Sequence, residues 1–370
     1  MSIDFAEVLN RMTEMKASDV HLTAGFAPAV RVRGRILPLD DFPKLGSQDT
    51  REIVYSVLND SQRKRFENER QLDFAYAIPN VGRFRVNCFF QRGSISAAFR
   101  HIPHELHSLE SLGLPNVLHQ FCRKPRGFVL VTGPTGSGKS TTLASMVDVI
   151  NEEREEHILT IEDPIEFLHR HKSCIVNQRE IGPDAIDFGQ ALKAALREDP
   201  DVILVGEMRD LETISTALTA AETGHLVFAT LHTQSTAQTV DRIIDVFPPH
   251  QQQQVRMQLS IALQGIVTQQ LIPTSDGAGR VVACEILVPT PAIRNLIREG
   301  KTHQIYQALQ TSGSVGMQTM DAHLASLVRG GQITRTMANQ RASVPEELGR
   351  LLGDPPKGHG AYEKSPVAIS

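Results

Sequence analysis

The chain has 370 residues, and at about 150 residues per domain this length suggests two or three domains. Hydrophobic residues make up 41% of the sequence and charged residues 22%, which excludes a wholly disordered chain, a collagen-like fibre and a disulfide scaffold. The net charge of −4, the lack of tryptophan and an aromatic content of 5% argue against nucleic-acid binding. The four cysteines form no CxxC pair, and the N-terminus lacks the layout of a signal peptide. No apolar run approaches the roughly 18 residues of a membrane span. We therefore expect a soluble, reduced, intracellular protein.

The first part of the chain has the mixed pattern of a small α+β domain, which we expect to span residues 1–102. Apolar residues at helical spacing predict a helix at the start of the chain, and alternating patterns predict a strand at 18–22 and a hairpin at 30–37. A polar helix is expected over residues 48–69. Two strands should follow it and meet at a turn of residues 80–82.

The middle of the chain alternates strand-like and helical segments, as an α/β domain does. After a linker at 103–112, the core is expected over residues 113–289. It has four uniformly apolar segments, at 128–132, 157–161, 201–205 and 226–230. Such segments are typical of a parallel sheet that is covered on both faces. Residues 290–352 should form a helical region, with helices at 292–299, 303–310, 321–329 and 337–341. Residues 353–370 have the low apolar content of a disordered tail.

Residues 133–140 match the phosphate-binding pattern GxxxxGK[ST] in full, between an apolar strand and a helix. The glycines let backbone N–H groups converge on phosphate oxygens, and the helix N-terminus adds partial positive charge. Lys139 is expected to reach the β and γ phosphates of ATP, and the Ser140 hydroxyl to ligate Mg²⁺. The residues expected to bind the nucleotide are Gly133, Pro134, Thr135, Gly136, Ser137, Gly138, Lys139, Ser140 and Thr141.

Two acidic positions follow apolar strands. Glu207 comes one residue after the segment 201–205, with Gly206 between them, and could hold Mg²⁺ or orient the attacking water. Glu162 and Asp163 end the segment at 157–161, at the edge where parallel sheets bind ligands. Glu162 could act as a general base. Solvated loop acids are the alternative at both positions.

Two histidines, His225 and His232, bracket the apolar segment 226–230. They show no third ligand at metal-site spacing, so zinc is disfavoured. A hydrogen-bonding role near the γ-phosphate and a purely structural role both remain open for each histidine.

Taken together, these motifs resemble the secretion ATPases. The resemblance is carried by residues 17–22, 82–87, 133–140, 161–166, 196–209 and 223–233, and the segment 290–299 narrows it to the type IV pilus retraction branch. It covers roughly residues 1–350. The resemblance implies hexameric rings in which each subunit joins a PAS-like N-terminal domain to a RecA-like core. It also implies a motor that drives pilus disassembly and twitching motility at the inner face of the cytoplasmic membrane. The implied partners are an inner-membrane platform protein and the pilus base.

The resemblance also assigns site residues. Residues 133–140 become the Walker A loop, Glu162 lies in the aspartate box and Glu207 is the Walker B glutamate, while His225 and His232 lie in the histidine box. Arg83 and Arg100 resemble N-terminal-domain arginines that approach nucleotide phosphates. Alternation with Phe84, Val86 and Cys88 independently places Arg83 on a polar strand face, but Arg85 shares that face, so the choice between them depends on the family alone.

Two departures limit the resemblance: the tail after Leu352 matches no family element, and the features typical of the extension ATPases are missing. Pilus extension and type II secretion ATPases tend to be longer at the N-terminus and often carry paired CxxC zinc ligands, which this chain lacks, whereas the accessory retraction ATPases of the PilU type stay in contention. A nucleic-acid motor or a non-hydrolysing assembly subunit is a further alternative, and the composition and the intact nucleotide motifs argue against them.

Residues 292–297 carry no nucleotide chemistry. Ile293, Leu296 and Ile297 form an apolar stripe, Thr290 is an expected N-cap, and Arg294 is expected at the surface. An ordinary packed helix is one interpretation. The family resemblance favours a helix that relays nucleotide state to the pilus machinery.

Overall fold

The computed structural model describes residues 4–32, 34–78, 82–102 and 106–354. The chain forms two compact units, one of residues up to 106 together with 164–168, the other of residues 107–163 and the chain from 169 onward. Residues 80–81 of the expected turn, 103–105 of the expected linker and 355–370 of the expected tail lie outside the described residues. The finer domain boundaries remain a prediction.

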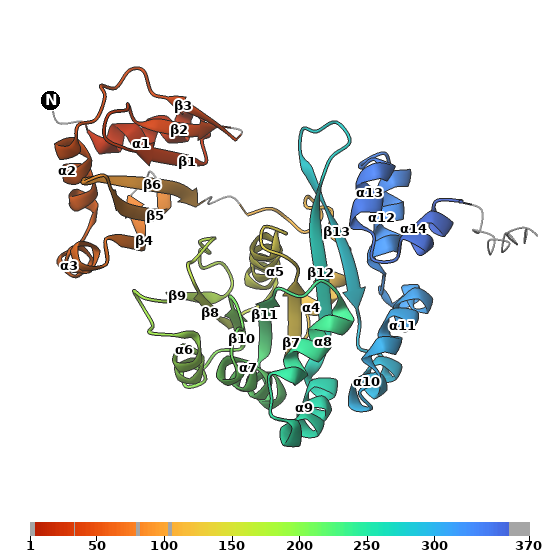
Figure 1. Ribbon diagram of the computed structural model, residues 1–370. Helices are drawn as coiled ribbons and strands as arrows, with labels where there is room; N and C mark the ends of the chain where they lie inside the picture. Colours follow the sequence, from red (N-terminus) through yellow and green to blue (C-terminus); the bar gives the residue numbers. More distant parts are fainter. Residues whose placement is uncertain (1–3, 33, 79–81, 103–105, 355–370) are drawn as a thin grey trace, which may run out of the picture. The chain divides into compact units, whose positions relative to one another are not determined.

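The first unit is a six-stranded antiparallel sheet with helices α1, α2 and α3 packed on it (Figure 1). Its strands are in the order β3-β2-β1-β6-β5-β4. The strands are β1 Asp19–Leu22, β2 Ala29–Val32, β3 Arg35–Pro38, β4 Gln71–Ile78, β5 Gly82–Gln91 and β6 Ser94–Ile102, and the helices are α1 Phe5–Glu14, α2 Ser47–Val57 and α3 Asp60–Glu69. Phe84, Val86 and Cys88 are fully buried, so the predicted alternation of β5 is confirmed.

The single helix expected over residues 48–69 is wrong, because the chain breaks between α2 and α3. Leu58 is extended, and Asn59 caps α3 by accepting a hydrogen bond from the Gln62 N–H at 2.8 Å while Gln62 Oε1 accepts from the Asn59 N–H at 3.0 Å. This reciprocal capping starts a new helix.

The second unit is built on a seven-stranded sheet in the order β13-β12-β7-β11-β10-β8-β9. Its strands are β7 Gly127–Thr132, β8 His157–Glu162, β9 Ile175–Glu180, β10 Val202–Val205, β11 Leu226–Leu231, β12 Leu263–Pro273 and β13 Arg280–Leu287. All neighbours are parallel except β12 and β13, which form an antiparallel hairpin. The α/β prediction and its four apolar strands are confirmed, whereas β9, β12 and β13 were not anticipated.

Helices cover both faces of this sheet (Figure 1). One face buries an apolar cluster with α6 Phe188–Ala195, α7 Leu211–Thr223, α8 Thr236–Asp245 and α9 Pro249–Ala262. The other face packs against α4 Val117–Cys122 and α5 Lys139–Glu153. Burial on both sides explains why the central strands are uniformly apolar.

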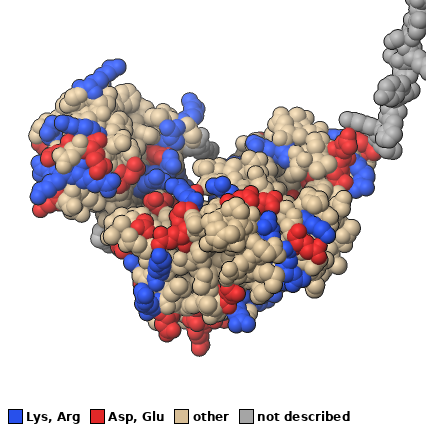
Figure 2. All heavy atoms as spheres, turned by 60° about the horizontal axis from the view of Figure 1, so that its bottom comes forward, with Lys and Arg blue, Asp and Glu red and all other residues tan. Residues whose placement is uncertain are grey.

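The helical pattern after residue 290 is confirmed as α10 Pro291–Arg298, α11 Ile305–Thr311, α12 Met320–Arg329 and α13 Arg335–Arg341, with an unanticipated α14 Pro345–Leu351. The last three helices form a cluster with Ile272 and Ala283 of the hairpin. In the part of the chain that the structure describes, no helix has the length and apolar character needed to cross a membrane. Acidic and basic side chains are interspersed over the face drawn in Figure 2.

Candidate active site

The phosphate-binding motif forms a loop between β7 and α5. The chain leaves buried Thr132, turns through the loop and enters α5 at Lys139, so the loop lies at the N-terminus of a 15-residue helix. A side chain at Gly133 would lie 2.3 Å from the Gln269 carbonyl oxygen, so only glycine fits there. Lys139 Nζ donates to the carbonyls of Gly133 at 2.9 Å and Pro134 at 3.2 Å, which places its ammonium over the loop.

The other candidate groups lie at the same edge of the sheet, because parallel strands bring their carboxyl ends together. Neighbouring strands are about 4.8 Å apart. His232 follows β11, next to β7, and Glu207 follows β10, the second strand from β7. Glu162 ends β8, the third strand. Four consecutive strands of the sheet thus lead to residues at one edge, which are Lys139, His232, Glu207 and Glu162.

Glu207 is held by an arginine and a histidine. Arg209 Nη2 lies 2.6 Å from Glu207 Oε2, and His232 Nε2 lies 2.9 Å from Glu207 Oε1. The Arg209 hydrogen bond, aided by the charges of His232 and Arg209, lowers the pKa of Glu207 although partial burial opposes this. Sequence reasoning missed Arg209 as a site residue, and its position two residues after Glu207 was the available signal.

Glu162 is oriented by two polar neighbours. Thr160 Oγ1 donates to Glu162 Oε1 at 2.7 Å, and Gln178 Nε2 donates to the same oxygen at 3.2 Å. A side chain at Gly206 would lie 3.2 Å from the Glu162 Cα, so glycine lets the end of β10 approach Glu162 closely. This explains the glycine that separates the strand from Glu207.

His225 is not brought to this edge. It precedes the first residue of β11, its carbonyl accepts the Gly127 N–H, and its Nδ1 lies 3.0 Å from the Ala220 carbonyl. At about 3.3 Å per residue, β11 separates His225 from His232 by about 23 Å. Of the two roles left open for each histidine, the structure favours the structural one for His225, whereas His232 lies at the edge of the sheet that carries the phosphate loop.

Arg83 and Arg100 lie in the first unit, on β5 and β6. Arg85 is directly opposite Arg100 in the register, so Arg83, Arg85 and Arg100 share one sheet face. Arg100 Nε lies 2.9 Å from Asp19 Oδ1, and its side chain is 68% exposed. The phosphate-binding role expected of these arginines stays a prediction.

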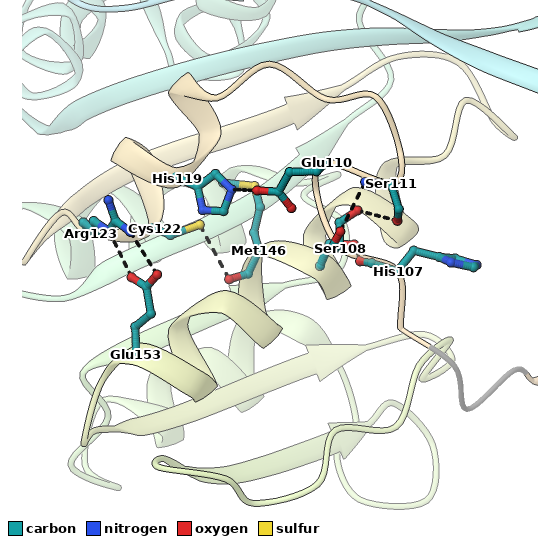
Figure 3. A network of polar contacts seen from close by, with 10 residues as sticks. His107, Ser108, Glu110, Ser111, His119, Cys122, Arg123, Met146 and Glu153 are labelled. Carbon is teal, nitrogen blue, oxygen red and sulfur yellow. Dashed lines mark hydrogen bonds and ion pairs between the residues drawn. The ribbon is translucent and has the colours of Figure 1, made fainter.

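A cavity of about 720 Å³ opens beside the phosphate loop and is lined by Gly138, Thr141 and Thr142, by residues 110–114 and by the β12–β13 hairpin. Figure 3 shows how the segment before α4 is held there. Ser145 Oγ of α5 donates to the His107 carbonyl at 2.6 Å, and His119 Nε2 lies 2.6 Å from Glu110 Oε1. Gly138, Thr141 and Thr142 line this cavity, so it adjoins the phosphate loop.

The predicted metal ligands, Ser140 and Glu207, are oxygen donors of the kind that Mg²⁺ prefers. Among the described residues, no three His, Cys, Asp or Glu side chains cluster as a metal site would require. A metal here would therefore depend on phosphate oxygens and water for most of its ligands, which is usual for Mg²⁺.

The helix α10 lies outside the site. Thr290 caps it by accepting the Ile293 N–H, Ile293 and Ile297 are fully buried, and Leu296 packs against the same cluster, as predicted. Arg294 is half-buried rather than a free surface residue, because its guanidinium donates to the carbonyls of Ser260 and Ile261 at the end of α9.

Comparison with known proteins gives concordant results. Residues 84–334 match the family described as Type II/IV secretion system protein. The chain is 53% identical to the type IV pilus retractation ATPase PilT of Pseudomonas aeruginosa over 94% of this chain and 100% of the relative, and 43% identical to the type IV pilus ATPase PilU of that organism over 95% and 91%. It is also similar to the crystal structure of the pilus retraction motor PilT with bound ADP, with a TM-score of 0.89, 52% identity and coverage of 94% of this chain and 99% of that one.

Proposed function

Because the chain belongs to the type II/IV secretion system protein family, we propose that it is an ATP-hydrolysing motor that powers type IV pilus retraction. The observation that carries this proposal is the complete phosphate loop with Glu207, His232 and Glu162 at the same edge of the sheet. The similarity of the chain to a pilus retraction ATPase supports it. The lower identity to PilU makes an accessory motor the second candidate.

In this proposal, the Lys139 ammonium exchanges the carbonyls of Gly133 and Pro134 for phosphate oxygens of ATP. Ser140 and Glu207 are the residues that would hold Mg²⁺, which when bound offsets phosphate charge. Glu207 and Glu162 are the candidates to orient or deprotonate the attacking water, and the choice of general base between them stays open. His232 helps to hold Glu207 in place.

The proposed motor is a homohexamer that acts on an inner-membrane platform protein and the pilus base, at the inner face of the cytoplasmic membrane. Arg83 and Arg100 are proposed to act on nucleotide phosphates when the ring is assembled. Their common sheet face and the exposure of Arg100 support this role.

Two experiments test the proposal. Lys139→Ala should abolish phosphate release by the purified protein, because the phosphate charge loses its compensation. Deletion of the gene should leave excess surface pili that do not retract. Absence of surface pili in the deletion strain would contradict a retraction motor. If a second retraction ATPase gene alone restores full pilus retraction in the deletion strain, the accessory role is favoured.

A further inference from the structure

Gln269 lies directly beneath the phosphate loop. Its strand β12 runs parallel to β7, with Thr268 level with Thr132 and their buried hydroxyls 2.7 Å apart. Gln269 is therefore level with Gly133, where the loop begins. Only 1% of its surface is exposed, so it belongs to the floor of the site.

Gln269 contacts the loop through one strong hydrogen bond. Its Nε2 donates to the Ser137 carbonyl at 2.7 Å, and both groups are buried. A carbonyl oxygen is only an acceptor, so the amide must present its NH₂ group to Ser137. A Cβ added at Gly138 would lie 3.2 Å from the same nitrogen, which shows how closely the loop approaches it.

This contact decides which way the next peptide points. In a trans peptide, the C=O of Ser137 and the N–H of Gly138 point in opposite directions. With the carbonyl turned inward to Gln269, the Gly138 N–H points away from Gln269. Convergent N–H groups of this kind make the phosphate-binding concavity.

We infer that Gln269 is a positioning residue for the nucleotide, which holds the Ser137 carbonyl so that the Gly138 N–H faces the phosphates. The inference rests on the proposed function, in which residues 133–140 bind ATP. Within the described chain, Gln269 Oε1 and Ser137 Oγ make no hydrogen bond, so the donated bond is what ties this side chain to the loop.

The role predicts an effect on affinity more than on rate. The Gly138 N–H serves bound ADP, bound ATP and the transition state alike, so its loss removes uniform binding and raises Kd and KM with little change in kcat. Gln269→Met keeps the size of the side chain but removes the donor. We expect it to weaken ADP binding about tenfold, as for the loss of one hydrogen bond. Gln270→Met, on the same strand, is the matched control and should bind ADP like the unmodified chain.

Gln269→Glu tests the donated hydrogen bond through the pH dependence of ADP affinity. An ionised carboxylate cannot donate to the Ser137 carbonyl, but the protonated acid can. Relative to the unmodified protein at each pH, ADP affinity of Gln269→Glu should be low near about pH 8 and recover towards about pH 5. A constant ratio would mean that neither the donor nor the charge at this position affects the nucleotide.

The outcomes separate the inference from the proposed function. Loss of ADP binding in Lys139→Ala together with normal affinity in Gln269→Met, or a pH-independent affinity ratio in Gln269→Glu, would overturn only the role of Gln269. Normal ADP binding in Lys139→Ala would overturn the nucleotide site itself. Failure of both Gln269 variants to fold while Gln270→Met folds would also overturn the inference, because the residue would then be structural.

Discussion

Removal of the Arg294 side chain should destabilise the protein without slowing hydrolysis. The guanidinium donates to two carbonyls at the last turn of α9, where a positive charge also suits the helix dipole. Charged hydrogen bonds contribute about 1.5–3 kcal/mol, and partial solvent exposure reduces this, so we expect Arg294→Ala to cost about 1–2 kcal/mol. For a unit of this size, the melting temperature should fall by about 2–8 °C.

The measurement is thermal unfolding of the purified variant, together with phosphate release per folded molecule. α9 leads into the start of β12, at the sheet edge opposite the phosphate loop, so the turnover of folded protein should not change. Arg298→Ala on the same helix is the control, since the Arg298 side chain donates a hydrogen bond to Asn295 within α10, and its contact with Gln253 of α9 is made by the backbone carbonyl, which alanine keeps. Equal melting temperatures for the two variants would refute the capping role of Arg294. If Arg298→Ala abolishes twitching while stability and turnover stay normal, α10 acts in coupling.

Three further perturbations follow from the site and the core. Glu207→Gln should retain ATP binding but slow phosphate release, since the amide accepts no proton; unchanged turnover would exclude Glu207 as catalytic. Arg100→Ala should depress turnover more than nucleotide binding, by up to about 10³-fold if it acts on transition-state charge, and an equal loss of both would indicate a ground-state contact. Burial raises the pKa of Glu285, which accepts two hydrogen bonds from Thr236. Stability is therefore lost as the pH rises above the ordinary carboxyl pKa and through the raised pKa of folded Glu285. Glu285→Gln should unfold at a higher temperature than the unmodified protein at neutral pH, and this advantage should disappear in acid.

The phosphate loop could be predicted because its signal is local. Eight consecutive residues form the motif, and the uniformly apolar composition of the neighbouring strands predicts that these strands are buried. The order of the strands, in contrast, depends on pairing between distant parts of the chain. This pairing places His232 and Glu207 at the edge of the sheet that carries the loop, and His225 at the opposite edge. A strand has two ends, and a residue pair that brackets it cannot occupy one site.

The hairpin of β12 and β13 was missed because nothing in the sequence separates β12 from the helix before it. Helix α9 ends at Ala262 and β12 begins at Leu263 without a turn, while Gln264, Gln269 and Gln270 interrupt the apolar pattern. Tertiary pairing with β7 overrides local preference here. Arg294 was misplaced for a similar reason, because its acceptors are more than 30 residues away.

The chain order of the sheet also governs when the nucleotide site can form during synthesis. β7 and the phosphate loop leave the ribosome early, but the residue that flanks them on one side, Thr268, comes 136 residues after Thr132. At about 5–20 residues per second, this delay is about 7–27 s. Until β12 emerges, the loop lacks Gln269 beneath it, so we expect a nascent subunit to reach its full nucleotide affinity only after most of the chain has been made.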